Sequence, residues 1–107
     1  MTDLRKKFDD FVAECKLVEY AVNKSGVTCI MEDDFYEDYN WFCVAFMTDK
    51  FGGIAAIIKY YDNKWFVNEK EVPSSMDALA PVPELMKDLY DKRDMDGLAD
   101  FINSQYD

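Results

Sequence analysis

The chain has 107 residues, of which 50% are hydrophobic and 16% aromatic, and its formal net charge is −10 because 22 acidic residues outnumber 12 basic ones. This composition suits a single domain, residues 1–107, with enough apolar material for one core. The charge disfavours direct binding of nucleic acid or of an anionic membrane, so we expect a basic partner.

The number and spacing of the cysteines indicate the compartment in which we expect the protein. Cys15, Cys29 and Cys43 form no Cys-x-x-Cys pair, and an odd number cannot all pair within the chain. We expect reduced thiols in the cytoplasm, meaning the host cytoplasm if the protein is phage-encoded. The charged N-terminus lacks the apolar core of a signal peptide, and no stretch approaches the roughly 20 apolar residues of a membrane span.

The first segment predicts an amphipathic helix. Apolar residues recur there at intervals of three and four, which matches one face of a helix. Thr2 can cap its start and Gly26 can end it. The apolar stripe comprises Leu4, Phe8, Phe11, Cys15, Val18 and Val22.

The middle of the chain predicts four strands. A short strand is expected at Val27–Met31, and Trp41–Thr48 reads as a central strand buried on both faces because neither of its alternating sets is polar. Ile54–Tyr61 and Lys64–Glu69 follow, and Asp62-Asn63 is a typical two-residue hairpin turn between them. The last of these strands alternates polar and apolar residues, so we expect it at an edge of the sheet.

The C-terminal part predicts helices. Ser74 or Ser75 can cap a short turn ending at Leu79, and Pro83 suits the first turn of a helix running to about Lys92. Asp94 or Asp96 would then cap a last helix with Leu98, Phe101 and Ile102 inward. The expected fold is therefore α+β, with an N-terminal helix, a four-stranded mainly antiparallel sheet and two or three C-terminal helices.

The most unusual feature is the acidic stretch Met31–Asn40, which lies between the first two predicted strands. Residues 25–49 contain six acids and no basic residue, and three aromatic residues are interleaved with five of the acids. We expect a loop anchored at both ends. Its candidate partner-binding residues are Glu32, Asp33, Asp34, Tyr36, Glu37, Asp38 and Tyr39. A possible second acidic patch comprises Asp88, Asp91, Asp94, Asp96 and Asp100.

Motifs for catalysis, metal binding or cofactors are not apparent. Asp94-Met95-Asp96-Gly97 resembles part of a calcium loop, but Lys92 would occupy the first ligand position. Gly52-Gly53 has no Lys-Ser or Lys-Thr after it, as a phosphate-binding loop would require. A zinc site usually has four cysteine or histidine ligands, and the chain offers three cysteines and no histidine. We expect no enzyme, no cofactor and no metal.

The acidic stretch allows three interpretations. It could be a solvated segment that only aids solubility, or a weak divalent-cation site formed by Asp33, Asp34, Glu37 and Asp38. It could instead recognise a basic protein, because aromatic anchors among charges are typical of interfaces. In an extended chain, alternate side chains recur at roughly 6.6 to 6.8 Å, comparable to the separation of nucleic-acid phosphates. We favour the third interpretation.

In size and charge the chain is similar to two groups of small acidic proteins. These are phage-encoded anti-CRISPR inhibitors and bacterial immunity proteins that neutralise toxin nucleases. The resemblance implies a non-enzymatic inhibitor that occludes the nucleic-acid site of a basic enzyme, such as a nuclease. A structural or assembly component and a carboxylate-based enzyme are the alternatives of a different class. The apolar strands between Trp41 and Tyr61 also allow a homodimer interface.

Overall fold

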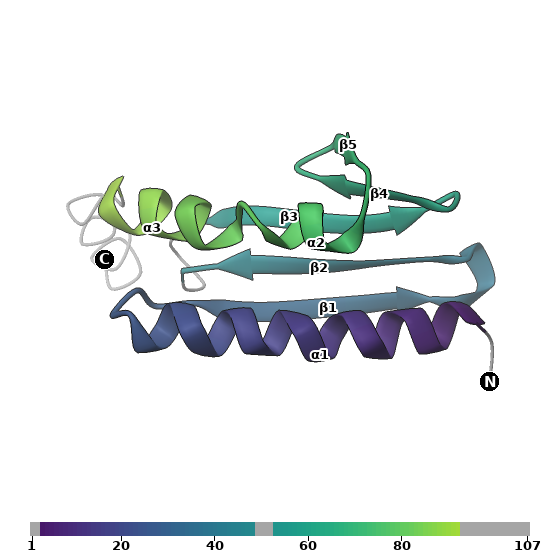
Figure 1. The fold of residues 1–107 in the computed structure, drawn as a ribbon, viewed down its shortest axis with the longest axis horizontal. Coiled ribbons are helices and arrows are strands. Elements are labelled where there is room, and N and C mark those ends of the chain that lie inside the picture. The colour runs from purple at the N-terminus through teal and green to yellow at the C-terminus, as the bar shows by residue number, and fades with distance from the viewer. Residues whose placement is uncertain (1–2, 49–52, 93–107) are drawn as a thin grey trace, which may run out of the picture.

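The computed structural model describes residues 3–48 and 53–92, which form an antiparallel five-stranded sheet with helices on one side (Figure 1). The strands follow one another as a meander in the order β1-β2-β3-β4-β5. The elements are α1 (Asp3–Lys24), β1 (Ile30–Tyr36), the 3-10 turn η1 (Glu37–Tyr39), β2 (Trp41–Met47), β3 (Ile54–Tyr61), β4 (Lys64–Val67), β5 (Lys70–Val72), α2 (Ser75–Leu79) and α3 (Val82–Lys92).

The amphipathic helix predicted at the N-terminus is confirmed as α1. Its stripe faces the sheet, with Phe8, Phe11, Cys15 and Val22 buried. Gly26 follows with φ 99°, a left-handed conformation that suits glycine after a helix end. The predicted cap Thr2 lies outside the described residues. Burial of this stripe explains why the segment is helical although its opposite face is charged.

The α+β class and the antiparallel meander are confirmed, but the strand count is five instead of four. Asp62-Asn63 forms the predicted two-residue turn, and both residues have positive φ values of 53° and 62°. Asn68 and Glu69 form a second turn of the same length, with φ values of 49° and 68°. This turn ends β4 at Val67 and starts β5, so the prediction of one edge strand over Lys64–Glu69 was wrong. β4 pairs on both sides, and β5 is the edge.

The two sides of the sheet differ, which corrects the prediction that β2 is buried on both. α1 contacts β1 and β2, α2 contacts β4 and β5, and α3 contacts β2 and β3. Phe42, Val44 and Phe46 are fully buried toward these helices, whereas the alternate β2 residues are only half-buried. Within residues 3–48 and 53–92 no helix covers that second side. We call it the open face; it carries Ile30, Glu32, Asp34, Tyr36, Trp41, Cys43, Ala45, Met47, Ile57, Lys59, Tyr61, Lys64, Phe66 and Glu71.

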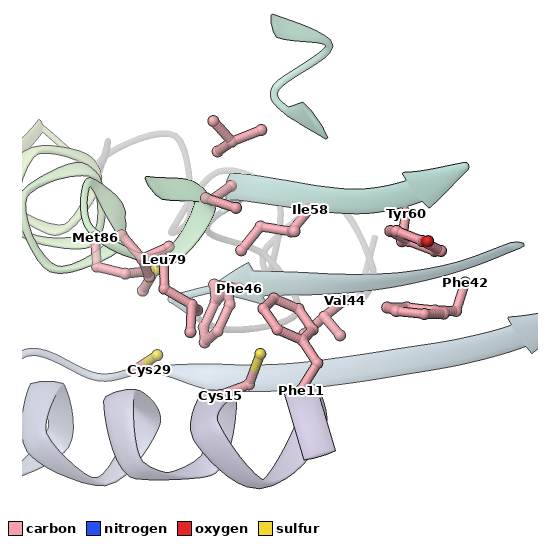
Figure 2. Packing of buried hydrophobic residues seen from close by; sticks show 14 of the residues in the cluster. Phe11, Cys15, Cys29, Phe42, Val44, Phe46, Ile58, Tyr60, Leu79 and Met86 are labelled. Atoms are coloured by element: carbon pink, nitrogen blue, oxygen red, sulfur yellow. The ribbon is translucent and has the colours of Figure 1, made fainter. Parts of the chain in front are cut away.

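The covered face holds the hydrophobic core, and Figure 2 shows Phe42, Val44 and Phe46 of β2 among its buried side chains. Four other aromatic rings surround Phe42. The Phe42 ring centroid lies 5.2 Å from Phe8, 6.2 Å from Phe11, 5.3 Å from Tyr60 and 5.8 Å from Trp65. Tilted, edge-on and offset arrangements at these distances are favourable for aromatic rings. One side chain of β2 therefore joins α1 to β3 and β4.

The predicted elements after the sheet are confirmed as far as Lys92. The Ser74 hydroxyl accepts a hydrogen bond from the Asp77 amide at 3.2 Å and caps α2. α3 begins at Val82 with a proline in its first turn and ends at Lys92. The last predicted helix, from Asp94 or Asp96 onward, lies outside the described residues.

The sequence contains no stretch of the length and apolarity of a membrane span, and the helices of the described ranges can be compared with this expectation. None of them is both long enough and apolar enough to cross a bilayer.

We predict that Phe42→Ala lowers the free energy of unfolding by about 3–5 kcal/mol, because it removes the ring that connects α1, β3 and β4 and leaves a cavity. Urea unfolding followed by circular dichroism measures the change. Tyr39→Ala is the matched control, since the Tyr39 side chain is 74% exposed and its loss should change stability by about 0.5 kcal/mol or less. A loss below about 1 kcal/mol for Phe42→Ala would contradict its central place in the core.

Candidate protein-binding surface

The prediction of a loop over Met31–Asn40 was wrong for residues 31–36, which belong to the edge strand β1, whereas residues 37–40 form the turn that leads into β2. Ile30–Tyr36 pair along their whole length with β2, from Ile30 opposite Met47 to Tyr36 opposite Trp41. The strand predicted at Val27–Met31 therefore begins three residues later and runs through the acids. Aspartate and glutamate are poor strand formers, but at an edge their side chains stay in water while the backbone pairs with an apolar neighbour.

Contacts with α1 hold β1 in this position. At one end, the Asn23 side-chain amide donates to the Cys29 carbonyl oxygen at 2.9 Å, and its oxygen accepts from the Cys29 amide at 2.8 Å. Toward the other end, the Phe35 ring lies 5.0 Å from Phe8, and the Arg5 guanidinium lies 5.1 Å from the centre of the Phe35 ring. The backbone of the acidic strand is thus fixed against both the helix and the neighbouring strand.

Strand geometry divides the predicted site between two faces. Glu32, Asp34 and Tyr36 lie on the open face, opposite Ala45, Cys43 and Trp41 of β2. Asp33 points to the helix side, since it is opposite the buried Val44. The remaining three residues, Glu37, Asp38 and Tyr39, form η1 at the end of the strand. All seven are exposed, but only three of them share the open face.

The acids of this stretch form no ion pair with any residue that the structure describes. The ion pairs in the described ranges join Arg5 to Asp9, Lys59 to Glu69, Lys64 to Glu71 and Lys87 to Asp91. Glu32, Asp33, Asp34, Glu37 and Asp38 are in none of them. The β1 edge, by which we mean these five residues on β1 and η1, therefore presents five carboxylates without a cationic partner in the described chain.

Tyr36 joins the β1 edge to an aromatic surface that sequence reasoning did not identify. Its ring stacks on Trp41, with centroids 4.4 Å apart and planes inclined by 15°. The neighbouring Asp34 carboxylate raises the pKa of the Tyr36 hydroxyl, and its partial desolvation acts in the same direction. Next to this pair, a hollow of about 350 Å³ is lined by Trp41, Lys59, Tyr61, Phe66 and Glu69.

The strand alternation contained a signal for this surface. Trp41, Tyr61 and Phe66 lie on β2, β3 and β4. On each strand they belong to the alternate set of residues that points away from the covered face. Only the pairing register shows that these positions come together. The register was not available from composition or charge.

Tyr39 serves a different part of the surface. It lines a second hollow, of about 620 Å³, together with Leu4 and Lys7 of α1 and with Tyr60. The Lys7 ammonium lies 4.9 Å from the centre of the Tyr60 ring in the same region. Tyr36 and Tyr39 therefore lie at different hollows, although Tyr61 lines both of them.

The predicted second acidic patch is described only in part. Asp88 and Asp91 are exposed on α3, and Asp91 accepts a hydrogen bond from Lys87 at 3.0 Å that raises the pKa of the lysine. α3 lies over the end of the sheet where β1 begins, whereas η1 lies at the other end (Figure 1). The structure does not bring these two residues together with η1. Asp94, Asp96 and Asp100 lie outside the described residues.

The possible cation site is not assembled as proposed. Asp33 and Asp34 point to opposite faces of β1, while Glu37 and Asp38 belong to η1. Over residues 3–48 and 53–92, no group of three or more acidic or cysteine side chains is arranged to hold a metal ion.

Known protein families, curated protein sequences and solved structures give no match to this chain. The interpretation of the surface therefore depends on its own geometry and charge.

The three cysteines are free thiols, as expected, and burial raises their pKa values. Burial, with Glu14 and Asp33 nearby, raises the pKa of Cys15 to about 12, and burial with Glu19 raises that of Cys29 to about 11. The Cys43 pKa is raised by its partial burial and by Asp34. Thiols that remain protonated at neutral pH are poor nucleophiles.

We predict that the free energy of unfolding falls as the pH rises from about 9 to about 11. The unfolded thiols ionise near their ordinary pKa of 9.0, whereas the folded thiols of Cys15 and Cys29 stay protonated, so the folded state loses relative stability over this range. Denaturant unfolding at a series of pH values measures the slope. The double variant Cys15→Ala/Cys29→Ala should show a shallower decline, and an identical slope in both proteins would contradict the assignment.

Proposed function

We propose that the protein is a non-enzymatic inhibitor that binds a basic, nucleic-acid-binding enzyme and occludes its nucleic-acid site. A nuclease of a defence system is the partner type that we favour, as for anti-CRISPR proteins. A bacterial toxin nuclease, neutralised by an immunity protein, is the alternative partner. Both assignments use the same physical contact.

The observation that supports this proposal is the charge of the β1 edge. Its five exposed carboxylates have no ion-pair partner among residues 3–48 and 53–92, so they create a local negative potential. Like charges held together favour a basic partner that relieves their repulsion. A segment that served only solubility would not need a fixed backbone. Here the backbone is paired with β2 and attached to α1, so the charges keep a defined spacing.

Strand geometry also defines how a phosphate-like pattern could be presented. Glu32 and Asp34 are alternate residues of an extended strand, so their side chains are separated by roughly 6.6 to 6.8 Å on one face. Glu37 and Asp38 continue the negative charge beyond the strand end. The lysine and arginine side chains of a groove that binds a nucleic-acid backbone would contact this short row of carboxylates instead.

The proposed contact has a kinetic consequence. Complementary charge accelerates encounter between partners, and screening by salt removes the acceleration. Occlusion of the site would inhibit the enzyme without any reaction of the inhibitor.

We predict that replacing Asp33, Asp34, Glu37 and Asp38 with lysine abolishes capture of the basic partner and leaves folding cooperative, because the four side chains are exposed. Immobilised protein is incubated with cell lysate at low and at high salt, bound proteins are identified by mass spectrometry, and the partner's nuclease activity is assayed with purified components. The wild-type protein should retain a basic nucleic-acid-binding enzyme at low salt only, and should inhibit it.

A matched control has the same change of charge on the helix side. Lysine at Asp10, Glu14, Glu84 and Asp88 changes four exposed acids of α1 and α3 and should leave capture largely intact. Loss of capture in this control but not in the first variant would move the contact to the helices and contradict the proposal. So would failure of the wild-type protein to retain any basic enzyme at either salt concentration.

A further inference from the structure

The open face is a surface of the described molecule that the proposed function leaves mostly unexplained. The described helices α1, α2 and α3 contact the sheet on its other side, and several large apolar side chains of the open face are exposed in the part of the chain that the structure describes. Tyr61 is 55% exposed, and Tyr36 is 37% exposed. Contiguous apolar surface of this kind, rimmed by charge, is typical of protein interaction sites.

The shape of this face suits one inserted side chain. Trp41, Tyr61 and Phe66 come from three neighbouring strands and form the walls of the hollow of about 350 Å³. The Tyr36 ring stacks on Trp41 and extends the aromatic surface toward β1. Aromatic residues on a rigid sheet lose little conformational entropy when they bind, so such a hollow can concentrate binding energy.

The charges on the open face are arranged asymmetrically. Lys59 lies 3.9 Å from Glu69, and Lys64 lies 3.7 Å from Glu71, so both lysines already have an acidic partner. Glu32 and Asp34, on the β1 side, have no ion pair in the described chain. The uncompensated charge of the face is therefore negative and confined to one side of the aromatic hollow.

We propose that this open face is the docking surface for a basic protein partner that inserts an aromatic side chain into the hollow and places arginines over Glu32 and Asp34. Arginine suits this position because its guanidinium binds carboxylates in a fixed geometry and also stacks on aromatic rings such as the Tyr36–Trp41 pair. The inference rests on the proposed function, and it names the face of the sheet that makes the contact. Asp33, on the other side of β1, would lie outside this contact.

A second copy of the chain is a poorer occupant of the same face. Two copies would each bring the unpaired Glu32 and Asp34, whereas the lysines of the face are already paired with Glu69 and Glu71. The net charge of −10 adds repulsion between copies. A basic partner supplies the missing cations, which a second copy does not.

Two synthetic peptides of equal charge test the proposal. One contains Gly-Arg-Gly-Arg-Trp-Gly, and its match has glycine in place of tryptophan, so both offer arginines two residues apart but only one offers the aromatic side chain. Titration of isotope-labelled protein followed by NMR gives affinities and the residues affected. We expect the tryptophan peptide to bind at least about tenfold more tightly and to shift the Trp41 indole resonance.

Variants on the two faces of β1 test whether binding depends on the acids of the open face or on all the acids of the β1 edge. Glu32→Gln/Asp34→Asn should weaken the tryptophan peptide by at least about tenfold, whereas Asp33→Asn should change its affinity less than about twofold. Tyr61→Thr and Phe66→Thr should remove the preference for tryptophan while circular dichroism remains unchanged. Threonine is chosen because it is a good strand former and Tyr61 and Phe66 are not fully buried.

Each outcome decides a different claim. Equal binding of the two peptides, an effect of Asp33→Asn as large as that of Glu32→Gln/Asp34→Asn, or no binding of either peptide would overturn the open-face proposal. Self-association in sedimentation that is abolished by Phe66→Thr would assign the face to a second copy and would also overturn it. If a basic enzyme is captured from lysate but the two peptides bind equally, the proposed function stands and the open face is not its binding site. If no enzyme is captured but the peptide results are as expected, the open face is a binding site and the proposed function is wrong.

Discussion

The pairing of β1 with β2 on one side only is the constraint on which the rest of the surface depends. A strand that carries Glu32, Asp33 and Asp34 in succession must expose carboxylates on both faces of the sheet, and an edge position leaves these side chains in water. The same residues discourage the β1 strand of a second copy from pairing at that edge, because its acids would be brought against these acids. The acids of β1 therefore require an edge position, and at that position they keep the edge unpaired.

The anchoring of β1 turns a charged segment into a defined surface. Phe35 packs on Phe8 beneath the strand, and Asn23 holds the chain where it enters β1. On the opposite side, Tyr36 stacks on Trp41 and connects the acids to the aromatic hollow. The same strand thus contributes apolar contacts to the core, acids to the edge and one aromatic ring to the open face.

Local pattern was sufficient to predict the elements that bury a regular stripe or end in a recognisable turn. The spacing of Phe8, Phe11 and Cys15 predicted α1, and Asp62-Asn63 predicted the hairpin between β3 and β4. β1 could not be predicted in this way, because its acids favour a loop and only pairing with an apolar neighbour makes them a strand. β5 was missed because its turn has no glycine, although Asn68 and Glu69 adopt the required positive φ values.

The candidate site was predictable in residue identity but not in geometry. Charge counting selected the acids of the β1 edge, yet alternation along a strand sends Asp33 and Asp34 to opposite faces. The aromatic hollow needed the register of three strands before its members could be seen as neighbours. The open face was not predicted because β2 was expected to be buried on both faces. Two apolar sets of alternating residues do not show whether a helix packs on each face.

The central claim is that Ile30–Tyr36 is an edge strand paired with β2 alone, and native-state amide hydrogen exchange tests it most directly. In an antiparallel edge strand, every second amide donates to the neighbour and the others point to solvent. The account predicts alternating protection along Ile30–Tyr36, next to continuous protection in the interior strand β2. Uniformly fast exchange across Ile30–Tyr36, with β2 still protected, would show that the acidic stretch is a loop and would contradict the account.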